Sequence, residues 1–400
     1  MEAKIVVIDS IMGSGKSSYA IQKMNEDSDG SYIYITPFLS EVQRIKENCS
    51  NKKFIEPKNL GKGKLDSFNE LLKKNKNITS THALFKMANE DTMDLIRAND
   101  YILILDEVMD VVTQIHLNKD DLKVLTTMNL IIVDETGIVR WNDEMKDFDS
   151  KYNDMKLMCK NNSVFKVNDN LMMWTFPVEV FKSFKVVYVM TYKFKGQVQK
   201  YYYDLYDIKY EYNSVRFNNE NNRYELTEYI EHDDLSAIKN LIHIVPDDDK
   251  LNRIGDDKYS LSKSWFKKKE LLYETINKNL MNFFKNRCKG KSTDNMWCTF
   301  KDYKSHLSGK GYSKGFVSLG ARATNDYVDK KNLAYCANIF LNPYLELFFH
   351  KNGVTVDEET YALSELIQWI YRSQIRRGDE IYLYLPSSRM RSILIKWLEV

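Results

Sequence analysis

Cysteine and long apolar runs are both scarce in this 400-residue chain, and each scarcity excludes a class of protein. The five cysteines are scattered without a CxxC pair, which argues against a zinc site or a disulfide framework. We expect free thiols in a reducing cytoplasm. No apolar run reaches the roughly 18 residues of a membrane span, and no basic segment followed by an apolar stretch marks a signal peptide.

An excess of charge of one sign is also missing. The chain has 58 Lys and Arg against 56 Asp and Glu, a net charge of +2, which excludes a uniformly basic nucleic-acid coat protein. Any contact with a polyanion must come from local clusters of basic residues. Core material is plentiful, with 26 Tyr and 19 Phe. The length predicts two domains of roughly 200 residues, which we place at 1–195 and 196–400.

Short apolar runs alternate with helical stretches in the first half. They lie at residues 4–9, 32–36, 101–106, 130–134 and 185–191. Nearly continuous apolar runs of this length are typical of strands buried on both faces. They predict an α/β fold with a mostly parallel sheet and helices on both faces. Residues 130–141 resemble a hairpin turning at residues 135–137, which we expect to be an insertion packed on that sheet.

The second half repeats the α/β order less clearly. Strand candidates lie at residues 240–246, 297–300, 315–319 and 380–385, and helices are expected at 363–377 and 388–399. This pattern predicts a second lobe of the same class.

Residues 10–17 read SIMGSGKS, which matches the phosphate-loop pattern GxxxxGK[ST] except that Ser10 replaces the first glycine. An apolar strand precedes the loop and a helix-compatible stretch follows it. Glycines let the backbone N–H groups converge on one anion, and the helix N-terminus adds its positive end. Lys16 would neutralise phosphate oxygens and Ser17 would bind Mg²⁺. We therefore predict that ATP and Mg²⁺ are held by Gly13, Ser14, Gly15, Lys16, Ser17 and Ser18.

The apolar run at residues 101–106 ends in two carboxylates, Asp106 and Glu107. A magnesium-dependent site needs an acidic group at the end of a neighbouring strand. Asp106 would hold Mg²⁺ through water, and Glu107 would act as general base toward the attacking water. Asp134 and Glu135 are a rival pair for the same two roles. We rank them second, because a hairpin turn is expected at these residues.

Several stretches resemble, in order, the motifs of superfamily 2 helicases, of the kind often encoded by bacteriophages. Residues 35–38 with Glu41 and Arg44 resemble motif Ia, residues 79–82 motif Ib, residues 106–109 motif II and residues 190–192 motif III. The resemblance implies two tandem RecA-like lobes with ATP between them. It also implies contacts to a nucleic-acid backbone, with DNA favoured, from Thr36, Pro37, Arg44, Thr81, His82 and Arg322.

In the second half, residues 368–377 resemble motif VI and residues 322–326 could serve as motif V. The resemblance implies that Gln368, Arg372 and Arg376 reach the γ-phosphate. Arg372 and Arg376 are four residues apart, so a helix would place them on one face. The chain departs from the family at Met109, the last position of motif II, and in motif VI, where glycines are absent and Ile375 replaces the second arginine. Which arginine inserts is left open.

Lysines and aromatic residues are interleaved over residues 263–291. This pattern suits a single nucleic-acid strand, which needs backbone charge and base stacking. An amphipathic helix with aromatic residues in the core would show the same pattern.

The combined prediction is an ATP-dependent helicase or translocase acting in phage replication or recombination. Two alternatives stay open. One is a helicase-fold regulatory protein that binds a protein partner with little ATP turnover. The other is a packaging-motor ATPase, which would add an acidic two-metal nuclease cluster, for which residues 247–249 and 256–257 are the available carboxylates.

Overall fold

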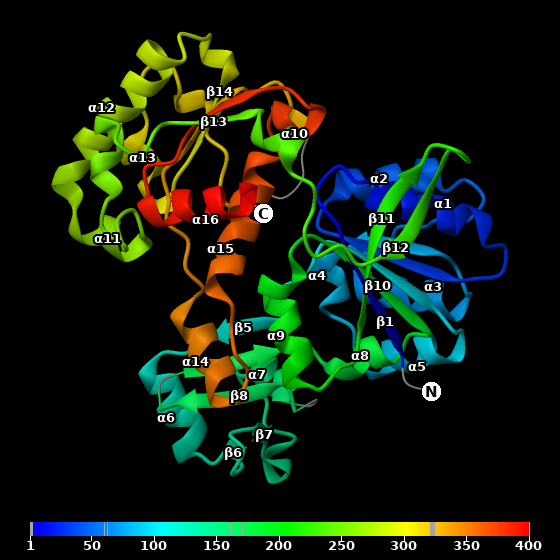
Figure 1. The fold of residues 1–400 in the computed structure, drawn as a ribbon. Coiled ribbons are helices and arrows are strands. Elements are labelled where there is room, and N and C mark those ends of the chain that lie inside the picture. The colour runs from blue at the N-terminus through cyan, green and yellow to red at the C-terminus, as the bar shows by residue number, and fades with distance from the viewer. Residues whose placement is uncertain are drawn as a thin grey trace. The chain divides into compact units, whose positions relative to one another are not determined.

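The computed structural model describes residues 3–59, 61, 63–159, 162–169, 171–320 and 325–399. The chain forms two compact units (Figure 1). The first contains the residues up to Ser10, Ser14–Tyr229 and Asn342–Val356, and the second contains Ile11–Gly13, Ile230–Leu341 and the residues from Asp357 onward. The boundary expected after residue 195 falls inside the first unit, because two later strands extend the sheet of that unit.

The first unit is built on a seven-stranded sheet of order β12-β11-β1-β10-β4-β2-β3. All neighbouring strands are parallel except β12, which runs antiparallel to β11. The expected apolar runs at 4–9, 32–36, 101–106 and 185–191 all become strands of this sheet. The strands are β1 Lys4–Asp9, β2 Tyr32–Thr36, β3 Ile78–Thr81, β4 Ile102–Asp106, β10 Val186–Thr191, β11 Glu211–Asn218 and β12 Arg223–Glu228.

Helices cover both faces of this sheet. Val6 and Ile8 of β1 pack with Met24 of α1 and Ile45 of α2 in one core. From β3 to β4, from β4 to β10 and from β10 to β11 the chain runs across the sheet in the direction opposite to that from β1 to β3. Because crossovers between parallel strands are right-handed, the helices of these connections, α5, α8 and α9, lie on the opposite face. The helices are α1 Lys16–Glu26, α2 Leu39–Asn48, α3 Lys64–Lys73, α4 His82–Phe85, α5 Glu90–Ala98, α8 Val178–Lys182 and α9 Val198–Leu205.

A middle region between β4 and β10 forms a separate small core. Its three-stranded antiparallel sheet has the order β5-β9-β8, and a hairpin joins β6 to β7. The hairpin confirms the prediction for residues 130–141. Its expected packing on the main sheet is wrong, because Leu130 and Val139 pack with Leu125, Met155 and Val164 instead. The elements are β5 Val112–Ile115, α6 Lys119–Thr127, β6 Ile131–Val133, β7 Val139–Trp141, α7 Asn153–Cys159, β8 Val164–Asn168 and β9 Leu171–Thr175.

A helix from late in the chain completes this region. Helix α14 (Pro343–Lys351) packs beside β5 and β8 in the first unit (Figure 1). The Phe348 ring lies 5.3 Å from that of Phe165, centroid to centroid, and Phe349 lies 5.5 Å from Tyr201. The Lys351 ammonium donates to the carbonyl of Val167. The first unit therefore includes a segment from late in the chain.

The second unit contains a fully parallel sheet of order β13-β16-β15-β14. Trp297 of β14 and Phe283 lie in a core on one face, and Tyr335 of β15 contacts Trp369 of α15. The strand expected at 315–319 is wrong, since only an isolated bridge joins Trp297 to Phe316 there. The elements are α10 Ser236–Lys239, β13 Ile242–Ile244, α11 Lys263–Lys268, α12 Tyr273–Asn282, β14 Asn295–Cys298, α13 Lys304–Leu307, β15 Asn332–Tyr335, α15 Glu358–Ile370, β16 Ile381–Tyr384 and α16 Ser388–Leu398.

The expected fold class, two α/β lobes with mostly parallel sheets, is confirmed by these topologies. All five cysteines are free thiols, as expected. The aromatic residues of the 263–291 stretch pack into the core of the second unit while its lysines are exposed, which supports the amphipathic-helix interpretation. Among the helices that the structure describes, none is long and apolar enough to cross a membrane.

Candidate nucleotide site

The predicted site residues of the first unit lie along one edge of its main sheet. Because the strands are parallel, their carboxyl ends meet at the same edge. The register pairs Asp9 with Thr191 and Met190 with Asp106, so the ends of β1, β10 and β4 are level with one another. The phosphate loop follows β1 directly, and the two predicted carboxylates end β4.

The loop after β1 has the backbone that an anion-binding loop requires. Gly13 and Gly15 have φ values of +87° and +96°, in the left-handed region that glycine adopts without strain. Helix α1 begins at Lys16 with Gly15 at its N-cap, so Ser17 and Ser18 lie in its first turn. The N–H groups of a first turn have no partner within their helix and point toward the loop. The predicted strand, loop and helix are therefore all present.

Ser10 has a structural role at the position where the pattern usually has glycine. The Val215 N–H of β11 donates to Ser10 Oγ at 2.9 Å, and the Ser214 hydroxyl donates to the Asp9 carbonyl at 3.1 Å. The Ser10 N–H donates to the carbonyl of Thr191 on the other side. Ser10 thus continues the pairing of β1 with both neighbouring strands at the point where the loop begins.

Two groups in the loop are suited to a phosphate chain. The Lys16 ammonium lies 2.5 Å from the Ser10 carbonyl, folded over the loop. Ser14 Oγ is buried, and the described part of the chain offers it no hydrogen-bond partner. A cation and an unsatisfied hydroxyl beside first-turn N–H groups fit a triphosphate.

The carboxylates at the end of β4 favour a nearby cation. The pKa of Asp106 is raised to about 7, mainly by burial and then by the charge of Glu107, while the hydrogen bond from Tyr34 opposes the rise. The Tyr34 hydroxyl of β2 donates to Asp106 Oδ2 at 2.9 Å. A partly buried carboxylate with a negative neighbour is costly unless a cation such as Mg²⁺ offsets its charge. The donor set therefore fits a magnesium site.

Glu107 has a strained backbone. Its φ of +67° is in a region that residues other than glycine rarely adopt, and its N–H donates to the Met190 carbonyl of β10 at 3.0 Å. Such strain persists where the surrounding structure imposes it, often at functional sites. Two residues later, the Met109 N–H donates to Gln199 Oε1 of α9 at 2.9 Å. The segment after β4 is therefore fixed on both sides.

Asp9 is a site residue that the sequence analysis missed. Its buried carboxylate accepts hydrogen bonds from the N–H groups of Lys193 at 2.7 Å and Phe194 at 2.9 Å. Burial raises the pKa of Asp9, while these two hydrogen bonds and the charges of Lys16 and Lys193 oppose the rise. Asp9 joins the phosphate loop to the segment after β10. An acidic residue ending an apolar run, directly before the loop, was the available signal.

The residues that resemble motifs Ia and Ib lie at the ends of β2 and β3, on the same sheet edge. The register pairs Thr36 with Thr81, and Pro37 and His82 follow them. Thr36 is fully buried and His82 nearly so, whereas Thr81 is partly exposed. Arg44 of α2 forms an ion pair with Glu41 at 2.7 Å. The sheet register therefore places Thr36 and Thr81 side by side, and their predicted contact with nucleic acid stays a prediction.

The motif VI-like residues in the second unit differ from the prediction. Helix α15 ends at Ile370, so Arg372 and Arg376 do not share a helix face, and that prediction is wrong. Arg372 is 5% exposed and donates to the Ser318 carbonyl at 3.4 Å, while Arg376 is exposed in a short 3₁₀ turn. Gln368 donates to Ser364 Oγ at 3.3 Å. Arg322 lies outside the described residues.

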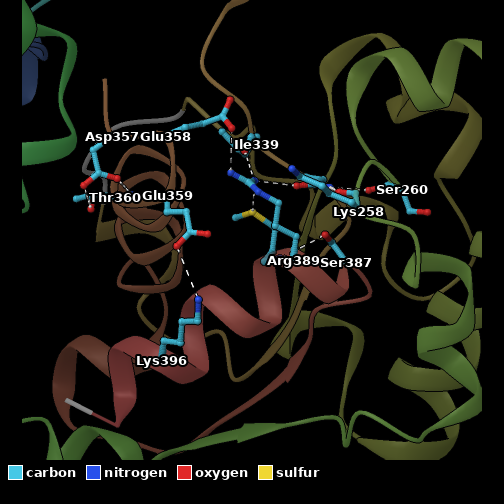
Figure 2. A network of polar contacts seen from close by, with 12 residues as sticks. Lys258, Ser260, Ile339, Asp357, Glu358, Glu359, Thr360, Ser387, Arg389 and Lys396 are labelled. Carbon is cyan, nitrogen blue, oxygen red and sulfur yellow. Dashed lines mark hydrogen bonds and ion pairs between the residues drawn. The ribbon is translucent and has the colours of Figure 1, made fainter. Parts of the chain in front are cut away.

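A polar network surrounds Arg389 at the start of α16 (Figure 2). Its guanidinium donates to Asn338 Oδ1 at 3.0 Å and to the Ile339 carbonyl at 2.7 Å, and lies 3.6 Å from Glu358. Asn338 in turn donates to the carbonyls of Lys258 and Ser260. The network ties α15 and α16 to the segment after β15, so we interpret it as structural.

Comparison with known proteins identifies relatives of this chain. Residues 236–398 match the family model described as the YonV C-terminal Rossmann-like domain, and residues 112–174 match that of the YonV middle domain. The chain is 44% identical over 410 residues to the SPbeta prophage-derived uncharacterized protein YonV of Bacillus subtilis (strain 168). The match covers 99% of each of the two chains.

Among solved structures, the fold is similar to one described as "XPD_Helicase", at 12% identity over 99% of this chain and 94% of that one, with a TM-score of 0.47. It is also similar to S. tokodaii Xpd4, at 11% identity over 98% and 94%, with a TM-score of 0.49. These likenesses carry no conclusion about activity. The near full-length match at 44% identity does establish kinship, and the chain belongs to the YonV family.

Proposed function

We propose that this protein is a magnesium-dependent ATPase that moves along nucleic acid as a helicase or translocase. The observation that carries the proposal is the shared sheet edge, where the phosphate loop, Asp106 and Glu107 lie at the level ends of β1, β10 and β4. A phosphate loop alone suits any nucleotide-binding protein. The two carboxylates at the end of a nearby strand add a ligand for Mg²⁺ and a general base, which hydrolysis requires.

Each residue has a specific role in this proposal. The first-turn N–H groups of α1 and the Lys16 ammonium hold the phosphate oxygens, and Ser17 and Asp106 hold Mg²⁺. Bound Mg·ATP supplies the phosphoanhydride bond that is cleaved. Glu107 takes a proton from the attacking water through its carboxylate oxygen. Asp9 and Ser10 keep the loop at a fixed position relative to the sheet.

The nucleic-acid side of the proposal concerns the same edge, one and two strands beyond Asp106. Thr36 and Thr81 end β2 and β3, Pro37 and His82 follow them, and Arg44 lies in α2. In this proposal the accessible groups among them hold a phosphate backbone without base specificity. DNA is the proposed substrate. The prophage origin stated for the Bacillus subtilis relative supports a role in phage replication or recombination.

One observation favours a second candidate function. Arg372 is buried against Ser318, so that it contributes no exposed cation to a phosphate. This favours a helicase-fold regulatory protein that binds nucleotide, turns it over slowly and acts on a protein partner. The packaging-motor alternative loses support, since Asp247 and Asp249 are paired with Arg391 and Arg287. Among the residues described, no group of three or more His, Cys, Asp or Glu side chains is placed to hold the metal ions of a nuclease.

ATP hydrolysis measured with and without nucleic acid tests the proposal. We expect a low basal rate that single-stranded DNA, duplex DNA or RNA raises by about tenfold or more, because strand binding completes a translocating motor. Hydrolysis that no nucleic acid changes, together with tight binding of a protein partner, would favour the second candidate. Absence of hydrolysis under every condition would contradict the motor.

A prediction about the magnesium site follows from the Tyr34 hydroxyl. Tyr34→Phe removes the hydrogen bond to Asp106 Oδ2 and leaves the ring in place. We expect the Mg²⁺ concentration for half-maximal hydrolysis to rise about tenfold, as when a group that orients a metal ligand is lost. Tyr32→Phe is the matched control, because the hydroxyl of this neighbouring β2 residue donates to Asp27 instead. An equal effect of both variants would contradict the role assigned to Tyr34.

A further inference from the structure

Strand β12 brings an aromatic ring onto the phosphate loop. A Cβ atom placed on Gly15 would lie 1.9 Å from Cε1 of Tyr224, so the edge of this ring packs directly against the Gly15 backbone. Gln22 of α1 fixes Tyr224 from both sides of its peptide: its Nε2 donates to the Tyr224 carbonyl at 3.0 Å, and its Oε1 accepts from the Tyr224 N–H at 3.1 Å. The ring therefore has a defined position beside the start of α1.

A pocket of about 760 Å³ adjoins this ring within the first unit. Its walls include Tyr19, Gln22 and Lys23 of α1 and Arg223, Tyr224 and Leu226 of β12. The volume is suitable for a nucleoside. Tyr19 follows Ser18 directly, so the pocket begins one residue beyond the predicted phosphate ligands. Tyr224 both touches the phosphate loop and lines the pocket. The nucleoside part of a triphosphate held by the loop would extend from there.

The polar side chains of the pocket are mostly engaged with one another. Gln22 is paired with the Tyr224 backbone, Arg223 forms an ion pair with Glu26, and Asn221 donates to Glu225. A site distinguishes one base from another through hydrogen bonds between the edge of the base and polar groups that have no other partner. Stacking on an aromatic ring, in contrast, accepts every base, because each base has a π face.

We propose that Tyr224 is the base platform of the nucleotide site and that the site holds purine nucleotides by stacking, without discriminating adenine from guanine. This inference rests on the proposed nucleotide-binding function and adds the part of the ligand that the phosphate loop does not contact. Phe217, whose ring centroid lies 4.9 Å from that of Tyr224, supports the platform from the neighbouring strand.

Binding of Mg²⁺ complexes of ATP, GTP and inorganic tripolyphosphate to the full chain, measured by calorimetry, tests the inference. We expect ATP and GTP to bind within about threefold of each other, and both to bind about tenfold more tightly than tripolyphosphate, which has no base to stack. Tyr224→Leu should weaken ATP and GTP about tenfold and leave tripolyphosphate unchanged, whereas Tyr224→Phe should retain purine binding. Tyr259→Leu, at an exposed tyrosine of the second unit, is the control.

The outcomes separate this inference from the function on which it rests. If the wild-type chain binds nucleotides but Tyr224→Leu weakens ATP and tripolyphosphate equally, the platform is wrong and the nucleotide site stands. An affinity for ATP more than about a hundredfold higher than that for GTP would contradict binding of the base by stacking alone. If no triphosphate binds at all, both fail. Photocrosslinking of wild-type protein with 8-azido-ATP gives a readout independent of variant folding: the label should map to the peptide that contains Tyr224, and label confined to other peptides would overturn the platform.

Discussion

Replacing Lys16 by alanine is expected to reduce ATP turnover to about one hundredth of the wild-type rate or less, because the charge that offsets the phosphate oxygens is lost. Lys16 is the cation that the structure places over the phosphate loop, 2.5 Å from the Ser10 carbonyl. The first-turn N–H groups of α1 would remain, but their partial charges do not replace a full positive charge. Steady-state hydrolysis at saturating Mg·ATP, followed by phosphate release, measures the effect.

The unliganded Lys16→Ala variant should melt within a few degrees of the wild type, since the hydrogen bond to the Ser10 carbonyl that it loses contributes about 1 kcal/mol. The added stability that ATP gives the wild type should disappear. Lys73→Ala removes an exposed lysine paired with Glu70 and should change neither quantity. Full turnover by Lys16→Ala would show that the loop is not the site of hydrolysis.

Replacing Glu107 by glutamine is expected to separate binding from hydrolysis. Glutamine has nearly the same shape but cannot accept the proton from the attacking water, so kcat should fall by about two to three orders of magnitude. The affinity for Mg·ATP should stay within about threefold, because Glu107 contacts the water rather than the phosphates in the proposed arrangement. Single-turnover hydrolysis and equilibrium binding of a fluorescent ATP analogue measure the two quantities separately.

Glu90→Gln, at an exposed position in the first turn of α5, serves as the control. An unchanged kcat in Glu107→Gln would remove the general base from the proposal. The rival pair offers no replacement, because Asp134 lies in the β6–β7 turn, where its carboxylate accepts from the N–H groups of Thr136 and Ile138. A loss of ATP binding would show instead that the Glu107 side chain maintains the conformation of the segment after β4, on which the position of Asp106 depends.

The central strands were predictable because they are buried on both faces. Each of β1, β2, β4 and β10 reads as an almost unbroken apolar run, and the structure places each within one residue of its expected bounds. The phosphate loop was predictable for a related reason. Its glycines, lysine and serine must occur at fixed spacing if the N–H groups are to converge, so a short stretch of sequence carries the whole geometry.

The outer strands were not predictable by the same argument. β11 and β12 lie at the end of the sheet and mix polar with apolar residues, so neither shows a continuous apolar run. The contact between Gly15 and Tyr224 joins positions 209 residues apart, and no local pattern encodes it. The same holds for Asp9, whose partners Lys193 and Phe194 are supplied by the segment after β10.

The end of α15 shows a third kind of limit. Consecutive residues from Trp369 to Ser373 are all buried, with exposed fractions of 6% or less. Successive side chains on a helix point in different directions, so this burial reflects packing from several sides rather than one apolar stripe. The sequence shows no Gly or Pro near Ile370 to mark the helix end. The arginines were consequently assigned to a helix that had already ended.

The position of α14 has a consequence for how the protein is made. All strands of the main sheet of the first unit have been synthesised once Glu228 has left the ribosome. Phe348 and Phe349, which pack against Phe165 and Tyr201, are synthesised later. At typical rates of synthesis the roughly 120 intervening residues take on the order of ten seconds. During that time an apolar surface of the nascent first unit is uncovered while β13, β14 and β15 are already emerging. The first unit therefore cannot finish folding before most of the second has been synthesised.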